Sequence, residues 1–206
     1  MTVKKRNVMQ SIVAKIKKRI YSKGRGFVFT KSHFLDLGSR SAVAKGLERL
    51  VHSGTIRRLA RGLYDYPEKD PVLGELPANY ERIAQALAGR DNLKIQPSGA
   101  YAANLLGLTE QVPAKIVFLT DGSYRKMQIG NQQIVLKRTT PKNMATAGRI
   151  SGLVIQALRF IGQSYVDDKV IGILKKRLTA KDKQMLVADL RYAPAWIEKV
   201  VKVFYD

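Results

Sequence analysis

The chain has 206 residues, of which 45% are hydrophobic, so it can bury a core. Its formal net charge is +21, and a positive field of this size favours polyanions, nucleic acid above all. It contains no cysteine and only two histidines, which excludes disulfides, thiolate metal sites and a cysteine nucleophile and leaves too few ligands for the usual metal motifs. No apolar run approaches the roughly 18 residues of a membrane span, and no secretory signal follows the basic N-terminus, so we expect a cytoplasmic protein without a membrane partner.

The positive charge is concentrated in the first third of the chain. Residues 1–66 hold 16 basic and 3 acidic side chains, a net of +13, whereas residues 67–206 hold 21 and 13, a net of +8. The excess coincides with segments of regular hydrophobic periodicity rather than with a low-complexity tail. The charge therefore favours an ordered binding motif over the alternative of general solubility.

The first elements in chain order are a helix, a short strand and a second helix. Apolar residues at i, i+4 spacing predict a helix over residues 8–21, with Val8, Ile12, Ile16 and Ile20 on one face. Aromatic and β-branched residues predict a strand over residues 27–29. Thr30 or Ser32 is a suitable cap for a short helix that contains Phe34 and Leu35 and ends at Gly38.

A third helix, over residues 39–54, carries the strongest signal. Ser39 is a suitable N-cap and Gly54 a natural terminator. Helical phasing places four apolar residues on one face, namely Val43, Leu47, Leu50 and Val51. The opposite face is polar and basic and contains Arg40, Ser41, Lys45, Arg49 and His52. A basic outer face of this kind suits the DNA major groove, because arginine and lysine can donate to guanine O6 and N7.

Residues 55–66 predict a β-hairpin with an arginine-rich tip. Glycine at position 62 suits a turn over Ala60-Arg61-Gly62, so Arg61 is expected at the tip and Arg57 and Arg58 along the ascending strand. A basic wing can follow phosphates or enter the minor groove. The expected DNA-binding residues are therefore Ser39, Arg40, Ser41, Lys45, Arg49, Arg57, Arg58 and Arg61.

Three prolines and one glycine mark residues 67–77 as a linker between residues 1–66 and a C-terminal domain, residues 78–206. In that domain the pattern predicts helices over residues 78–89 and 98–106, then strands over residues 116–119, 124–129 and 132–137. Asp121-Gly122 and Gly130-Asn131 are hairpin signals, so the sheet is expected to be antiparallel. Four helices are expected after residue 147. The predicted fold class is α+β: an N-terminal winged helix-turn-helix and a C-terminal domain with a small antiparallel sheet and a helical tail.

Two parts of the sequence resemble AbiEi-type antitoxins of bacterial type IV toxin–antitoxin systems. The N-terminal likeness lies in FLDLGS (residues 34–39), LERL (47–50) and GTIRRLARGLYDYP (54–67), and the C-terminal likeness in PSGAYAANLLGLT (97–109) and QVP (111–113). The resemblance implies a repressor that binds double-stranded DNA at an inverted repeat in its own promoter, associated with the bacterial nucleoid. It also implies a C-terminal domain that counteracts a nucleotidyltransferase-like toxin without a stable complex.

No enzymatic activity is expected, and no cofactor or catalytic residue is assigned. Asp121 is expected in a turn, and Asp167-Asp168 at the start of a helix. Gly122-Ser123 resembles the turn of a nucleotidyltransferase, but no closely spaced carboxylate pair for metal ions follows it. The alternatives to an antitoxin are a solitary winged-helix regulator and an interaction module whose basic wing contacts RNA or an acidic protein.

Overall fold

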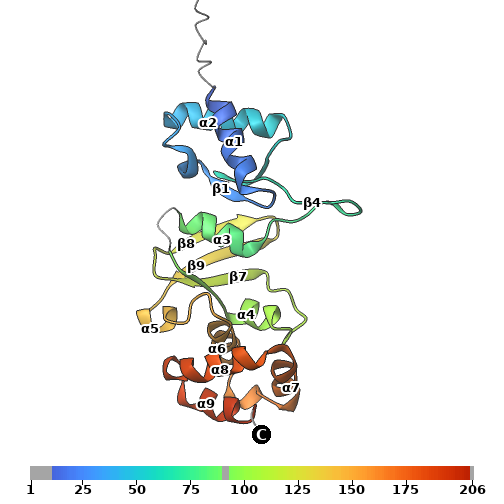
Figure 1. Cartoon of the computed structure of the whole chain (residues 1–206), viewed down its shortest axis with the longest axis vertical. Helices are drawn as coiled ribbons and strands as arrows, with labels where there is room; N and C mark the ends of the chain where they lie inside the picture. Colours follow the sequence, from blue (N-terminus) through green and yellow to red (C-terminus); the bar gives the residue numbers. More distant parts are fainter. Residues whose placement is uncertain (1–10, 90–92, 205–206) are drawn as a thin grey trace, which may run out of the picture. The chain divides into compact units, whose positions relative to one another are not determined.

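The computed structural model describes residues 11–89 and 93–204, and the chain divides into two units, residues 1–90 and residues 91–206 (Figure 1). Both units contain helices and small sheets, so the fold belongs to the mixed α+β class, as predicted. No helix of the described residues is long and apolar enough to cross a membrane. Within the same residues, no group of histidine and acidic side chains is placed to hold a metal ion.

Unit 1 begins with helices around a three-stranded sheet and ends with a small hairpin and a helix. Its elements are α1 (Ile12–Lys23), β1 (Val28–Thr30), the 3₁₀ helix η1 (Lys31–Phe34), α2 (Arg40–His52), β2 (Arg57–Ala60), β3 (Leu63–Asp65), β4 (Lys69–Asp70), β5 (Gly74–Glu75) and α3 (Tyr80–Ala88). The sheet is antiparallel in the order β1-β3-β2. The start predicted for the first helix, Val8, lies outside the described residues.

The core of unit 1 confirms the helical phasing of α1 and α2. Ile16 and Ile20 of α1 are buried with Val43, Leu47 and Leu50 of α2. Phe29 of β1 and Phe34 of η1 lie in the same cluster with their rings edge to face. The second helix is shorter than predicted, because only one turn of 3₁₀ helix precedes the loop to α2.

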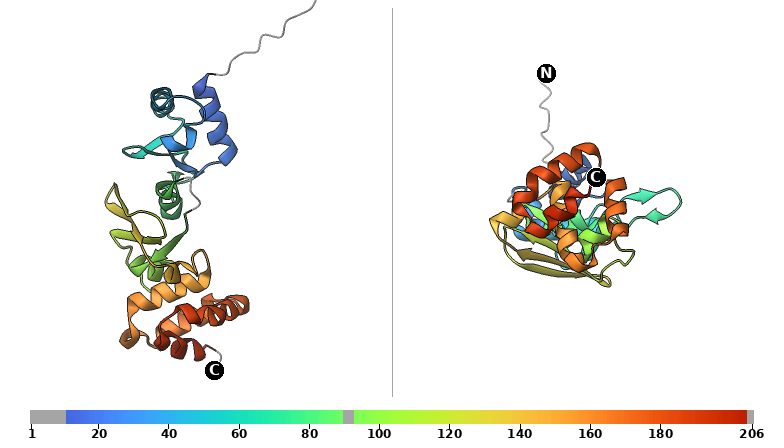
Figure 2. Two further views of the ribbon diagram at one scale, coloured as in Figure 1. Left: turned by 90° about the vertical axis from the view of Figure 1, so that its left-hand side faces the viewer. Right: turned by 90° about the horizontal axis from the view of Figure 1, so that it is seen from below.

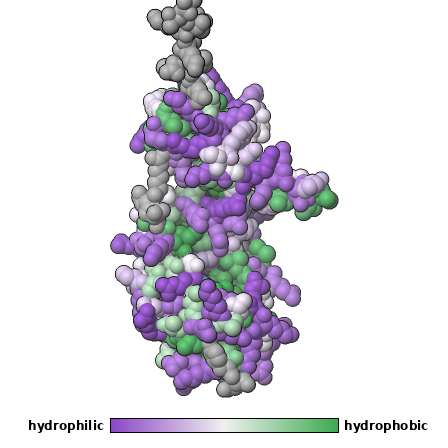
Figure 3. Space-filling model, viewed as in Figure 1, coloured by the Kyte–Doolittle hydropathy of each residue, from purple (hydrophilic) through white to green (hydrophobic). Residues whose placement is uncertain are grey.

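The segment expected to be a linker contains structure of its own. β4 and β5 pair as an antiparallel hairpin that projects from the rest of unit 1 (Figure 2). Its tip holds Val72 and Leu73, which are 90% and 76% exposed, and Figure 3 shows apolar atoms there. Asp70 Oδ1 accepts hydrogen bonds from both of their backbone amides, and these bonds lower the pKa of Asp70. Helix α3, expected to open the C-terminal domain, belongs to unit 1.

Unit 2 places helices against a four-stranded sheet. Its elements are β6 (Ile95–Ser98), α4 (Gly99–Leu105), β7 (Lys115–Thr120), β8 (Arg125–Ile129), β9 (Gln132–Arg138), α5 (Pro141–Met144), α6 (Ile150–Ile161), the 3₁₀ helix η2 (Gln163–Tyr165), α7 (Asp168–Arg177), α8 (Ala180–Asp189), the 3₁₀ helix η3 (Leu190–Tyr192) and α9 (Ala195–Lys202). The four helices predicted after residue 147 correspond to α6, α7, α8 and α9. They share one apolar cluster with α4, in which Leu106, Leu158 and Leu174 are fully buried.

The predicted antiparallel sheet of the C-terminal domain is wrong in two respects. The sheet contains an additional strand, β6, and its order is β6-β7-β9-β8, in which β7 and β9 run parallel. Asp121-Gly122 consequently does not join a hairpin, because β7 and β8 are not neighbours. Gly122 has another reason to be glycine, since a Cβ there would meet the side chain of Leu93. The second hairpin signal is confirmed: Gly130-Asn131 joins β8 to β9, and Gly130 has φ 56°.

Gly46 provides a test of the contact between α1 and α2. A Cβ at this buried position would lie 3.0 Å from Ile16 Cδ1. We expect Gly46→Val to lower the free energy of unfolding by about 1–3 kcal/mol through overpacking, as measured by urea denaturation. The control is Gly172→Val in α7, where a Cβ meets no atom within 4 Å; it should change stability by less than about 0.5 kcal/mol. Equal losses at the two positions would contradict the packing argument.

Candidate nucleic-acid interface

The N-terminal end of α2 is fixed by the predicted cap. Ser39 Oγ accepts a hydrogen bond of 3.3 Å from the Ala42 amide and lies 3.2 Å from Ser41 Oγ. The cap satisfies one of the backbone donors that a helix start leaves open. Both serines are exposed, so they stand at the start of the outer face of α2.

The outer face of α2 is polar and basic along its whole length. Arg40, Lys45 and Arg49 are all exposed, and no ion pair to them occurs among the described residues. A shallow hollow of about 440 Å³ is lined by Lys45, Glu48, Arg49 and His52. Glu48 is the one acidic side chain of α2, and its charge opposes the approach of a phosphate.

The β2–β3 hairpin turns at Arg61-Gly62, where Gly62 has φ 79° and Arg61 is exposed. Ala60 pairs with Leu63, but the register then shifts, so that Arg58 lies opposite Tyr64 and Arg57 opposite Asp65. The shift is a β-bulge, which re-aims the side chains that follow it. As a result the two neighbouring arginines have different surroundings: Arg58 is exposed, whereas Arg57 is half-buried.

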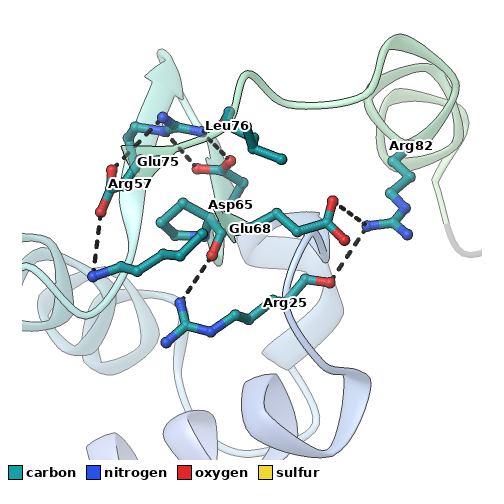
Figure 4. Close-up of polar contacts among 9 residues, drawn as sticks. Arg25, Arg57, Asp65, Glu68, Glu75, Leu76 and Arg82 are labelled. Atoms are coloured by element: carbon teal, nitrogen blue, oxygen red, sulfur yellow. Dashed lines mark hydrogen bonds and ion pairs between the residues drawn. The ribbon is translucent and has the colours of Figure 1, made fainter. Parts of the chain in front are cut away.

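Arg57 binds other residues of unit 1, although its sequence position predicted it as a DNA-binding residue. Its Nε and Nη2 donate to Asp65 Oδ1 and Oδ2 at 3.1 and 2.7 Å, and Nη2 also donates to the Leu76 carbonyl at 2.9 Å (Figure 4). Glu75 lies 3.7 Å away. The hydrogen bonds to Asp65 raise the pKa of Arg57. Asp65 is only 1% exposed, so the guanidinium neutralises a buried carboxylate and is not free to meet a phosphate.

Arg19 of α1 makes a comparable contact with the loop before α2. Its guanidinium donates to both carboxylate oxygens of Asp36, at 2.8 and 2.6 Å, and to the His33 carbonyl at 2.7 Å. These bonds to Asp36 raise the pKa of Arg19. They tie α1 to the loop between η1 and α2, and thereby support the position of the helix start.

Two further arginines brace the end of unit 1. Arg25 donates to the Pro67 carbonyl at 3.0 Å and lies 4.8 Å over the ring of Tyr66. Arg82 of α3 lies 3.9 Å from Glu68 and donates weakly to the Arg25 carbonyl (Figure 4). A count of charges along the sequence includes all of these arginines but does not show their partners.

Residues 15–186 match the model of DUF6088, a protein family of unknown function, and the chain belongs to that family. Among solved structures it is similar to the crystal structure of the RV2827C protein from Mycobacterium tuberculosis. The likeness covers 95% of this chain and 76% of that chain, at 14% sequence identity and a TM-score of 0.46, which is too distant to support a conclusion about fold or function. No curated protein matches the sequence.

The Arg57–Asp65 pair makes a prediction about stability. Arg57→Leu leaves a buried carboxylate unpaired, so we expect it to lower the free energy of unfolding by about 3 kcal/mol in urea denaturation. The double variant Arg57→Leu/Asp65→Leu should recover much of this loss, because it removes both charges. Arg58→Leu is the matched control on the exposed side and should cost less than about 0.5 kcal/mol. If both single variants cost the same, Arg57 has no special structural role.

Proposed function

We propose that this protein is a sequence-specific DNA-binding repressor in which residues 11–66 act as a winged helix-turn-helix. In this proposal η1 and α2 form the helix-turn-helix, and the β2–β3 hairpin is the wing. The observation that supports it best is the division of α2 into an apolar face, on which Val43, Leu47 and Leu50 are buried and Val51 is partly buried, and an exposed basic face, followed directly by a hairpin with arginine at its turn. This combination is more specific than positive charge alone.

Helix α2 is the proposed reading element. An α-helix fits the major groove, where the residues of its N-terminal end and outer face meet the edges of the bases. Arg40, Lys45 and Arg49 can donate to guanine, and Ser41 to several base groups. Ser39 serves chiefly as the helix cap, so its substitution would disturb the helix start as well as any phosphate contact.

The wing is the proposed positioning element. Arg58 and Arg61 are exposed and can meet phosphates or a narrow minor groove. Arg57 supports the wing from within through Asp65 and is not counted among the contacts. Five cationic side chains therefore remain for DNA: Arg40, Lys45, Arg49, Arg58 and Arg61.

The operon-level role rests on the sequence resemblance to AbiEi-type antitoxins. We propose that the protein binds an inverted repeat in its own promoter, represses its operon and counteracts a nucleotidyltransferase-like toxin without a stable complex. An inverted repeat is read by two copies related by a two-fold axis. We propose no catalytic step for either unit.

The number of contacts can be checked with the salt dependence of binding. If all five cations of one copy neutralise phosphates, the slope of log K against log salt is expected to be about −4.5 per bound copy, which corresponds to roughly a 500-fold loss between about 50 and 200 mM salt. Each cation that contacts a base instead of a phosphate makes the slope shallower by about 0.9. A gel-shift or fluorescence-anisotropy titration with the protein's own upstream duplex measures this slope. A nearly flat dependence would contradict DNA binding by this surface.

Single substitutions separate base recognition by α2 from backbone positioning by the wing. Lys45→Gln should relax the preference for the upstream duplex over a random duplex, whereas Arg61→Gln should weaken binding to both about equally and reduce the salt slope by about 1. Glu48→Gln should tighten binding, because it removes the one negative charge of the α2 face. Lys176→Gln, on the exposed surface of α7, is the matched control without effect. Equal affinity of the wild type for upstream duplex, random duplex and RNA would favour a general interaction module.

A further inference from the structure

Unit 2 has a second basic site that the proposed repressor function does not use. It is a hollow of about 340 Å³ beside the sheet. Its polar lining consists of Lys94, Asp121, Arg138 and Thr139, and Pro141 and Met144 provide apolar surface. The hollow is of the size and mixed character usual for small-ligand sites.

The hollow lies where the topology of the sheet favours a ligand. β7 and β9 run parallel, with Thr120 opposite Arg138 at their carboxyl ends. Asp121 follows β7 directly, and Thr139 follows β9. β6 is antiparallel to β7 with Ile95 opposite Thr120, so Lys94 reaches the same end of the sheet. In open α/β sheets, ligands bind outside the carboxyl ends of the parallel strands, and β7 and β9 are the one parallel pair of this sheet among the described residues.

The charge of this end of the sheet suits an anion. Lys94 and Arg138 are exposed, and neither has an ion-pair partner within the part of the chain that the structure describes. Arg125 at the start of β8 lies at the same end. Asp121 is the one acidic side chain in the lining. The local charge is therefore positive, which favours a phosphate group.

Thr139 is held in place by its neighbours. The Thr139 amide donates to the Thr120 carbonyl at 3.0 Å, which joins the ends of β9 and β7. Thr139 Oγ1 accepts a hydrogen bond of 2.8 Å from Asn143 Nδ2, and Asn143 Oδ1 in turn accepts one of 2.8 Å from Arg159. Since the threonine oxygen is already an acceptor, its own proton remains available to a ligand.

We propose that this hollow binds the phosphate group of a nucleotide. Lys94, Arg138 and the Thr139 hydroxyl would hold the phosphate oxygens, and Asp121 would accept hydrogen bonds from the sugar hydroxyls or the base. Pro141 and Met144 would lie against the apolar part of the ligand. The phosphate can come from a free nucleotide or from the backbone of a nucleic acid, and the chemistry of recognition is shared.

Calorimetric titration of the full chain tests the site with two kinds of probe: ATP, GTP, CTP and UTP as free nucleotides, and a short duplex as nucleic acid. We expect saturable binding of at least one nucleotide with a Kd below about 1 mM. Arg138→Gln should weaken it by about 10-fold or more, because a charge-assisted hydrogen bond is lost. Lys137→Gln is the matched control: it removes the same charge from the next position of β9, outside the lining, and should change the Kd less than about 2-fold.

If free nucleotides do not bind, but Arg138→Gln weakens binding of the duplex and Lys137→Gln does not, the phosphate comes from nucleic acid and the proposed site is supported. If neither probe responds to Arg138→Gln, or if both variants weaken binding equally, the site is overturned. Lys45→Gln on α2 should leave nucleotide binding unchanged. Failure of the repressor proposal would appear in the duplex-preference measurements alone, so the two outcomes are distinguishable.

Discussion

Asp65 lies almost completely inside unit 1, and the Arg57 guanidinium meets both of its carboxylate oxygens. A carboxylate taken out of water costs several kcal/mol unless it is paired and hydrogen-bonded. The same guanidinium reaches the Leu76 carbonyl, so one side chain joins the wing strands to the segment that leads to α3. The contact therefore links β2, β3 and the segment that leads to α3.

This pair also changes how the positive charge of the protein should be counted. Arg19, like Arg57, donates to both oxygens of an aspartate, and Arg25 is held by a carbonyl and a tyrosine ring. Such arginines stabilise the fold, and their charge is already compensated or held close to the protein. The exposed cations of α2 and of the wing tip differ from them, because they have no partner among the described residues. Net charge therefore overstates the number of side chains available for a polyanion.

Local patterns in the sequence predicted much of unit 1 and of the helical tail. The cap at Ser39, the buried face of α2, the Gly62 turn and the cap by Asp167 are short-range features, and the structure confirms them. Strand register and strand order were not predictable in the same way. The sequence does not show the bulge that sets Arg57 against Asp65, and the hairpin predicted at Asp121-Gly122 is inconsistent with the parallel pairing of β7 with β9. Both errors concern how strands pair, and both affect a candidate site.

The order of the unit 2 sheet leaves β6 and β8 at its edges. An edge strand offers unpaired backbone groups to other chains and invites aggregation. β6 contains Pro97, which lacks the amide donor such pairing requires, and β8 begins with the exposed charges Arg125 and Lys126. Each edge thus has its own protection against strand addition. Replacing these residues would make the protein prone to aggregate, even where the sheet itself stayed intact.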